Sequence, residues 1–137
     1  MSWKSSVRVA IAVMSDEKQR FLITQRPMST THAGFWEFPG GKIKDGERDE
    51  DALVREVKEE VDLDVQAYTF LGQISHHYSL LSVSLQIFHV HQYKGTAVCR
   101  EAQMDLRWVL FDDLKQYPFP EANVNILKLI RKAGLVS

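Results

Sequence analysis

The sequence predicts an α/β (α+β) fold in which a mixed β-sheet is flanked by helices. Three observations lead to this expectation: paired apolar runs near the N-terminus, an amphipathic helical segment in the middle of the chain, and a second helical segment near the C-terminus. Strands that are interrupted by one helix and closed by another bury their sheet by packing helices on its faces.

The first strands are predicted from β-branched and apolar residues. Residues 7–14 (VRVAIAVM) and 21–25 (FLITQ) form two such runs, and a polar turn at 15–19 separates them. Two extended segments joined by a short polar turn indicate hairpin-like strands. We therefore expect the chain to begin with this pair.

A long shaped loop follows, from Arg26 to Glu50. It contains six prolines and glycines, which interrupt regular structure: Pro27, Gly34, Pro39, Gly40, Gly41 and Gly46. Loops of this length in compact domains are usually functional. The chemistry of the protein is therefore expected to begin here.

A helix is predicted to begin at about Asp49. At 100° per residue, four apolar residues fall within one arc that faces the core: Leu53, Val54, Val57 and Val61. Either Asp49 or Glu50 is expected to cap the start of the helix.

The C-terminal half predicts three more strands and a last helix. The extended segments are 67–78, 80–93 and 106–111, and the helix runs from about Val124 to Ala133. Gly134 is the expected C′ residue of that helix, because glycine accepts the left-handed conformation that ends many helices.

Size, charge and cysteine usage limit the class of protein. A chain of 137 residues with 45% hydrophobic content can bury one core, so one domain over 1–137 is expected. The 17 basic and 18 acidic residues give a net charge of -1, which provides no global field to hold a nucleic acid polymer. Cys99 is the only cysteine, which suits a reducing cytoplasm and excludes an internal disulfide. With no apolar run near the roughly 20 residues of a membrane span, we expect a cytoplasmic monomer without membrane contact.

The middle helix carries a cluster of carboxylates. Glu56, Glu59 and Glu60 stand at i, i+3 and i+4, so they share one surface arc. An acidic helix face is ordinarily only solvated. Here, however, the glutamates follow a glycine-rich loop, and carboxylates beside exposed carbonyls, such as that of Gly40 or Gly41, provide the hard oxygen ligands that Mg²⁺ prefers. Since Mg²⁺ commonly keeps substrate phosphate in its shell, the cluster predicts a phosphate-bearing ligand, and Arg55 can orient Glu56 by charge-assisted hydrogen bonding.

These residues carry a family resemblance. The run 41–47 (GKIKDGE), seven further residues and then 55–63 (REVKEEVDL) resemble the Nudix box, in which glycine, glutamate and an Arg-Glu-x-x-Glu-Glu core stand at fixed separations. One position departs: Asp62 stands where the family usually has glycine, and aspartate is one of the residues that tolerate the left-handed conformation. The segments 34–42 (GFWEFPGGK) and 119–123 (FPEAN) are similar to the MutT branch, the 8-oxo-dGTP diphosphatases.

The resemblance implies a Nudix α/β/α sandwich, a cofactor and a reaction. Mg²⁺, with Mn²⁺ as a substitute, would be held by the Gly40 carbonyl and the carboxylates of Glu56, Glu59, Glu60 and Glu101. Arg55 and Glu47 would support this site. Water would attack the β-phosphorus of a nucleoside triphosphate and release pyrophosphate, with Glu56 or Glu101 as the general base. Glu101 taken alone is a polar-loop glutamate, which is usually solvated.

Substrate recognition has competing interpretations. By resemblance Arg26 would reach a phosphate, although it also reads as a surface arginine. Asn123 can present a donor and an acceptor to a purine edge, but an asparagine before a helix is also a common N-cap. Phe38, Tyr78 and Trp36 are candidate stacking residues, although aromatic residues are as often part of the core. His89 and His91 alternate along one strand, without an identifiable third ligand, and we assign them no metal.

Two rival functions remain open at this point. The first is a Nudix pyrophosphohydrolase for another substrate, such as an unmodified nucleoside triphosphate or ADP-ribose, because the box specifies diphosphate chemistry alone. The second is a non-catalytic Nudix-like binding module. That alternative predicts an eroded box, whereas all three helix glutamates and Arg55 are present.

Overall fold

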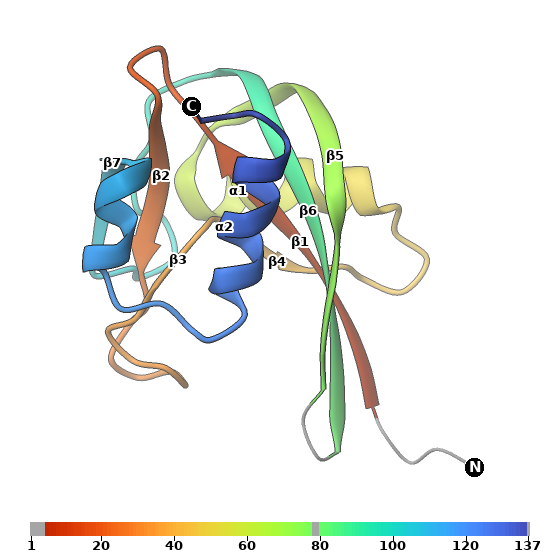
Figure 1. The fold of residues 1–137 in the computed structure, drawn as a ribbon. Coiled ribbons are helices and arrows are strands. Elements are labelled where there is room, and N and C mark those ends of the chain that lie inside the picture. Colours follow the sequence, from red (N-terminus) through yellow and green to blue (C-terminus); the bar gives the residue numbers. More distant parts are fainter. Residues whose placement is uncertain (1–4, 78–79, 137) are drawn as a thin grey trace.

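The computed structural model describes residues 5–77 and 80–136 and shows two sheets with helices packed on them (Figure 1). The larger sheet has the strand order β4-β1-β6-β5, and the smaller one has the order β3-β2-β7. The strands are β1 (Ser5–Met14), β2 (Arg20–Gln25), β3 (Trp36–Glu37), β4 (Gly40–Lys42), β5 (Asp64–His77), β6 (Leu81–Lys94) and β7 (Asp105–Leu110). The helices are α1 (Asp49–Val61), the 3-10 helix η1 (Phe111–Gln116) and α2 (Asn123–Lys132).

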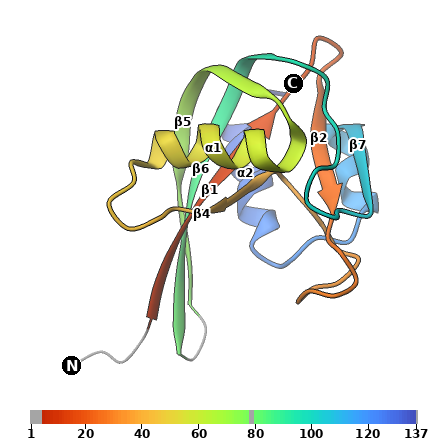
Figure 2. The ribbon, with the colours of Figure 1, turned by 180° about the vertical axis from the view of Figure 1, so that it is seen from behind.

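The larger sheet is mixed, as the sequence predicts. Strand β1 runs parallel to β6 and antiparallel to β4, while β5 and β6 are antiparallel. Helices α1 and α2 lie on opposite faces of this sheet, which the two opposite views show together (Figures 1 and 2). The arrangement is an α/β/α sandwich, and the predicted fold class is confirmed.

The two helices cover two separate cores, because the central strands are buried on both faces. Along β1, Ala10, Ala12 and Met14 face the α1 core, while Val13 faces the α2 core. Strand β6 divides its side chains in the same way. This alternation explains why residues 9–14 of β1 form a continuous apolar run and not an amphipathic one.

The prediction for the buried face of α1 is wrong at one residue. Leu53, Val57 and Val61 are fully buried as expected, but Val54 is 39% exposed and Ala52 takes its place in the core. The predicted acidic cap is also wrong, since the N-cap is Arg48 and makes no side-chain capping bond. Asp49 and Glu50 instead lie in the first turn, where negative charge interacts favourably with the helix dipole.

The first two strands are not the hairpin that the sequence indicates. They belong to different sheets and share only one isolated bridge, between Ser15 and Phe21. The polar turn is present, but β1 pairs with β4 and β6, while β2 pairs with β3 and β7. Long-range partners therefore outweigh the local connection.

The long loop and the C-terminal elements follow the predicted order with shifted ends. The loop contains two short strands, β3 and β4. The sequence analysis did not predict them, because the surrounding glycines and prolines indicate irregular structure. The 3-10 helix η1 was not predicted. Gly134 follows the C-cap Ala133 with a φ of 75°, which confirms the predicted C′ position. No helix among the described residues is long and apolar enough to cross a membrane.

Candidate functional site

The glycine-rich loop and α1 meet at Arg55, whose guanidinium holds several of the predicted site residues together. Its Nε and Nη2 donate to the two carboxylate oxygens of Glu47 at 2.8 and 2.9 Å. Its Nη1 donates to Glu56 at 2.7 Å and to Glu59 at 3.2 Å. Its Nη2 also donates to the backbone carbonyl of Lys42 at 3.0 Å. One planar cation thus fixes the loop relative to two helix carboxylates.

Glu47 is the loop residue most firmly bound to Arg55. Hydrogen bonds from Arg55, followed by one from the backbone N–H of Lys44, lower the pKa of Glu47 to about 2. Its hydrogen bonds to Glu47, and then to Glu56, raise the pKa of the Arg55 guanidinium. Glu47 is therefore ionised near neutral pH and closes the loop, because its Oε1 accepts from Lys44 N–H at 3.0 Å.

Glu60 is directed to the other end of the loop. Its Oε2 accepts a hydrogen bond from the backbone N–H of Gly40 at 2.9 Å. Burial raises the pKa of Glu60 to about 8, the Gly40 bond opposes the rise, and the negative charges of Glu37, Glu56 and Glu101 add to it. The carboxylates are thus close enough to repel one another.

The connection between β6 and β7 brings Glu101 to this cluster. The connection is anchored on the backbone carbonyl of Glu60, which accepts from Arg100 N–H at 3.0 Å and from the Gln103 amide at 2.9 Å. Burial, then the charges of Glu56 and Glu59, raise the pKa of Glu101. An exposed loop glutamate, ambiguous in the sequence, is therefore placed beside the helix carboxylates.

The end of α1 explains how the chain tolerates the departure from the family pattern at Asp62. This residue has φ 61° and ψ 35°, the left-handed conformation that glycine would otherwise supply. Lys58 and Arg100 form ion pairs with its carboxylate at 3.0 and 3.2 Å. The expected conformation is confirmed.

The donor set fits a hard divalent cation. Among residues 5–77 and 80–136, no group of three or more His, Cys, Asp or Glu side chains is arranged to hold a metal ion, and Arg55 and the Gly40 N–H engage the carboxylates of Glu56 and Glu60. Mg²⁺ is commonly bound through only one or two carboxylates together with water and substrate phosphate. Burial, and then the negative charges of Glu37, Glu56 and Glu101, raise the pKa of Glu60, and a cation would offset those charges.

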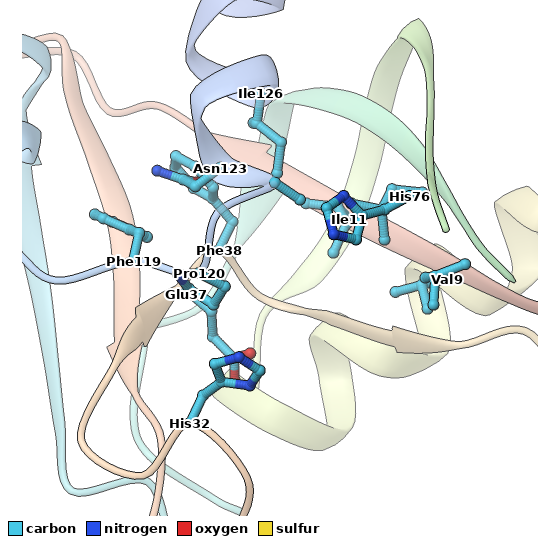
Figure 3. Close-up of a pocket in the computed structure, with 13 residues that line it drawn as sticks. Val9, Ile11, His32, Glu37, Phe38, His76, Phe119, Pro120, Asn123 and Ile126 are labelled. Carbon is cyan, nitrogen blue, oxygen red and sulfur yellow. The ribbon is translucent and has the colours of Figure 1, made fainter. Parts of the chain in front are cut away.

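A cavity of about 230 Å³ lies on the α2 side of the sheet, close to the loop (Figure 3). Phe38 and Asn123, which the sequence analysis predicts to bind substrate, both line it. The ring of Phe38 stacks on Phe119 with centroids 5.9 Å apart. The remaining lining is largely apolar, with Ile11 and Ile126 among the wall residues. A largely apolar lining suits a partly apolar ligand.

Asn123 is positioned to present a polar group to this cavity. It is 7% exposed and is the first residue of α2, while the N-cap is Ala122 and makes no side-chain capping bond. The N-cap interpretation is therefore wrong. Within the described part of the chain, the Asn123 side-chain amide makes no hydrogen bond, so its donor and acceptor are available to a ligand.

Other candidates are placed differently. Arg26 donates through Nη1 to Glu37 at 2.9 Å and through Nε to the carbonyl of Thr31 at 2.8 Å, so it is engaged within its own loop. Trp36 is buried against Tyr117 and does not line the cavity. Tyr78 lies outside the described residues.

The histidines of β6 make local contacts. His89 shares a hydrogen bond with Ser15 at 3.0 Å, and His91 shares one with Thr69 at 3.3 Å. Ser15 directly follows β1, and Thr69 belongs to β5. The two rings are 5.6 Å apart.

Sequence reasoning missed several residues of the cavity, including the charged residue Glu37. Glu37 lines it beside Phe38, and its carboxylate faces His32, which also lines it (Figure 3). The only available signal was the position of Glu37 within the run 34–42 that resembles the MutT branch.

An α/β/α sandwich in which an arginine joins a glycine-rich loop to an acidic helix defines a Nudix-type hydrolase. Comparison with known proteins agrees, since residues 9–129 match the model of the NUDIX domain. An 8-oxo-dGTP diphosphatase of Proteus vulgaris is 38% identical over 92 residues, which cover 67% of this chain and 82% of the relative. A CTP pyrophosphohydrolase of Escherichia coli is 30% identical over 86% of this chain and 87% of the relative.

Solved structures lead to the same family. A chain from a study of MutT from Aliivibrio salmonicida and Vibrio cholerae has a TM-score of 0.80 and 32% identity, and the match covers 93% of this chain and 99% of that chain. The chain therefore belongs to the Nudix family, and it is a Nudix pyrophosphohydrolase similar to the MutT enzymes.

Proposed function

We propose that this protein hydrolyses 8-oxo-dGTP to 8-oxo-dGMP and pyrophosphate in a Mg²⁺-dependent reaction, and so removes an oxidised precursor from the nucleotide pool. The observation that carries the proposal is the available amide of Asn123 beside the Phe38 ring, in a cavity close to the acidic cluster. The names of relatives support the substrate class, since several are 8-oxo-dGTP diphosphatases.

The acidic cluster supplies the ligands for the cation. Glu56, Glu59, Glu60 and Glu101 would hold Mg²⁺ together with the Gly40 carbonyl. When bound, the cation neutralises phosphate charge and lowers the pKa of a coordinated water. Arg55 keeps Glu56 and Glu59 oriented toward one another, and the Gly40 N–H orients Glu60.

Bond changes in the proposed reaction are those of in-line substitution. The oxygen of water forms a bond to the β-phosphorus, and the bond from that phosphorus to the oxygen bridging to the α-phosphate breaks. The nucleoside monophosphate leaves with that oxygen, and the proton of the water passes to a carboxylate. Glu56 is the first candidate for this base, because Arg55 bonds its Oε1 and leaves Oε2 to accept the proton. Glu101 is the alternative.

Recognition of the base is assigned to Phe38 and Asn123. The aromatic ring would stack on the purine, and the amide would bond two positions of its edge. Replacing Asn123 by Ala is expected to lower kcat/KM for 8-oxo-dGTP about tenfold or more, with a smaller loss for dGTP. The reason is that the two hydrogen bonds of the uncharged amide are proposed to be made together only with the oxidised base. Asn125→Ala, which alters an exposed asparagine of the same helix, is the matched control. An equal loss for both nucleotides would remove Asn123 from base recognition.

A second candidate substrate is CTP, because the E. coli relative is a CTP pyrophosphohydrolase that aligns with most of this chain. ADP-ribose is a third. The deciding assay measures turnover of 8-oxo-dGTP, dGTP, CTP and ADP-ribose with Mg²⁺, with Mn²⁺ and with EDTA. Selective turnover of 8-oxo-dGTP supports the proposal, preference for CTP replaces it, and the absence of any cation-dependent turnover would favour a binding module.

The same proposal includes the organisation of the protein. One domain over 1–137, a monomeric state and a cytoplasmic location are expected together with a small-molecule substrate. Size-exclusion chromatography with light scattering would test the monomer directly.

A further inference from the structure

Thr24 carries a buried hydroxyl that the reaction described above does not use. It lies on β2 and is 1% exposed, and its Oγ1 has no hydrogen-bond partner among the residues that the structure describes. A buried hydroxyl without a partner destabilises a fold, and valine has a similar shape and β-propensity without that cost. Such exceptions call for an explanation, and they are expected at functional sites.

The side chain of Thr24 points to the α1 side of the small sheet. Side chains alternate along a strand, and Leu22, two residues before Thr24, belongs to the core cluster that includes Val61 of α1. Leu106, the β7 residue in register with Thr24, packs against the same cluster. The hydroxyl therefore faces the same core as the end of α1, which carries Glu60.

Two further connections bring Thr24 close to Glu60. Glu37 of β3 is in register with Thr24, so the two side chains leave the sheet on the same face, with Cβ atoms about 5 Å apart. Burial raises the pKa of Glu60, and Glu37 is the carboxylate that adds most to this rise, so these two carboxylates are close. Gln25, the residue after Thr24, accepts through its carbonyl from the β6–β7 connection. In that connection, Gln103 donates to the backbone carbonyl of Glu60 at 2.9 Å.

The carboxylate of Glu60 has one oxygen that can accept a further hydrogen bond. Its Oε2 accepts from the Gly40 N–H at 2.9 Å, whereas its Oε1 accepts none within ranges 5–77 and 80–136. Glu37, the other carboxylate on this face, is already bonded by Arg26 at 2.9 Å. A hydroxyl rotates its proton toward an acceptor, so Thr24 offers a donor to Glu60. Hydrogen bonds to the ligand carboxylates of a metal hold them in place and tune the affinity for the metal.

We propose that Thr24 is a positioning residue of the cation site, whose hydroxyl donates a hydrogen bond to the Glu60 carboxylate when that carboxylate binds a divalent cation. This inference rests on the proposed function for the cation site alone and is independent of the nucleotide. It also explains why a hydroxyl stands at a core position. The group destabilises the protein without cation and stabilises the cation-bound form.

The test measures cation affinity and stability separately. Electron paramagnetic resonance gives the Kd for Mn²⁺ without nucleotide in the wild type, Thr24→Val and Thr24→Ser, and melting temperatures are measured in EDTA. Thr24→Val should raise the Kd about tenfold or more, as expected when a metal ligand loses its hydrogen-bond partner, whereas Thr24→Ser keeps the hydroxyl and should stay near the wild type. In EDTA, Thr24→Val should melt at or above the wild-type temperature, because the unpaired hydroxyl is gone. Thr69→Val, which removes an exposed hydroxyl from β5, is the matched control and should keep the wild-type Kd.

A double variant identifies the group through which Thr24 acts. Glu60→Gln alone is expected to weaken Mn²⁺ binding, and adding Thr24→Val should cause little further loss, because the hydroxyl no longer has its charged partner. Losses that multiply in the double variant would overturn the proposal, as would a wild-type Kd in Thr24→Val.

The remaining outcomes separate this inference from the proposed function. A lower melting temperature of Thr24→Val in EDTA would identify a hydroxyl that stabilises the fold itself, which contradicts the proposal. If the wild type and Glu60→Gln bind Mn²⁺ equally, the cation site of the proposed function fails, and this inference fails with it. If Glu60→Gln weakens binding and Thr24→Val does not, this inference alone fails.

Discussion

Replacing Gly41 by alanine should reduce activity while leaving the fold intact. A Cβ at Gly41 would lie 2.3 Å from both Cδ and Oε2 of Glu56 and 2.7 Å from Oε1. The φ angle of Gly41 is not positive, so an alanine can adopt the same backbone conformation. The conflict is therefore with one flexible carboxylate and not with the main chain.

The size of the displacement follows from these distances. Ordinary contact begins near 3.4 Å, so the carboxylate of Glu56 must retreat by about 1 Å. A retreat along the 2.7 Å hydrogen bond from Arg55 Nη1 would lengthen that bond to nearly 4 Å, beyond the range of a hydrogen bond. Displacement of a reacting group by 1 Å can cost on the order of 10²-fold in rate.

The assay is release of pyrophosphate from the preferred nucleotide, coupled to inorganic pyrophosphatase. We expect kcat of Gly41→Ala to fall by about 10²-fold, while its melting temperature stays level or rises slightly, because alanine lowers the entropy of the unfolded chain. Wild-type kcat in Gly41→Ala would refute the requirement for a fixed Glu56.

Three further changes test the packing and the electrostatics. Gly40→Ala should destabilise the fold by roughly 1–3 kcal/mol in urea unfolding, because its Cβ would lie 2.1 Å from the Ala10 carbonyl, a backbone atom that cannot move cheaply; equal stability to wild type would contradict this geometry. Leu53→Ala, at a fully buried residue, should cost about 2–5 kcal/mol, whereas Val54→Ala should change stability by less than about 0.5 kcal/mol, and comparable losses would place Val54 in the core. The third test, in EDTA, concerns the contribution of Glu60 to the free energy of unfolding. Between pH 4.5 and about 8 the folded state keeps a proton on Glu60 that the unfolded state releases. This contribution should therefore be fully present below pH 4.5 and be lost as the pH rises toward 8. Urea midpoints of wild type and Glu60→Gln at pH 5 and pH 8.5 measure this difference, and identical pH dependence in the two would show that Glu60 is not perturbed.

Much of the fold and of the site could be predicted from local sequence patterns. Glu56, Glu59 and Glu60 share a surface wherever their segment is helical, since their spacing matches the helical period. The left-handed Asp62 at the end of α1 follows from the position it occupies in the box. These features depend on residues close together in the chain, and the structure bears them out.

Features that depend on distant partners could not be predicted in this way. The exposure of Val54 depends on how α1 is rotated against the sheet, which the width of its apolar arc leaves undecided. Arg26 has the charge to bind phosphate, but its partner is Glu37 because β2 and β3 pair in register beside it.

What the sequence by itself determined is therefore the set of chemical groups and the helix and loop that carry them. The tertiary structure alone decided which groups meet: Gly40 with Glu60, Gly41 next to the Glu56 carboxylate, and helix α1 with the β6–β7 connection. The physical reason is that periodicity records the direction of a side chain relative to its own element. Contacts between elements depend on sheet pairing and helix rotation, which are set by the packing of the whole core.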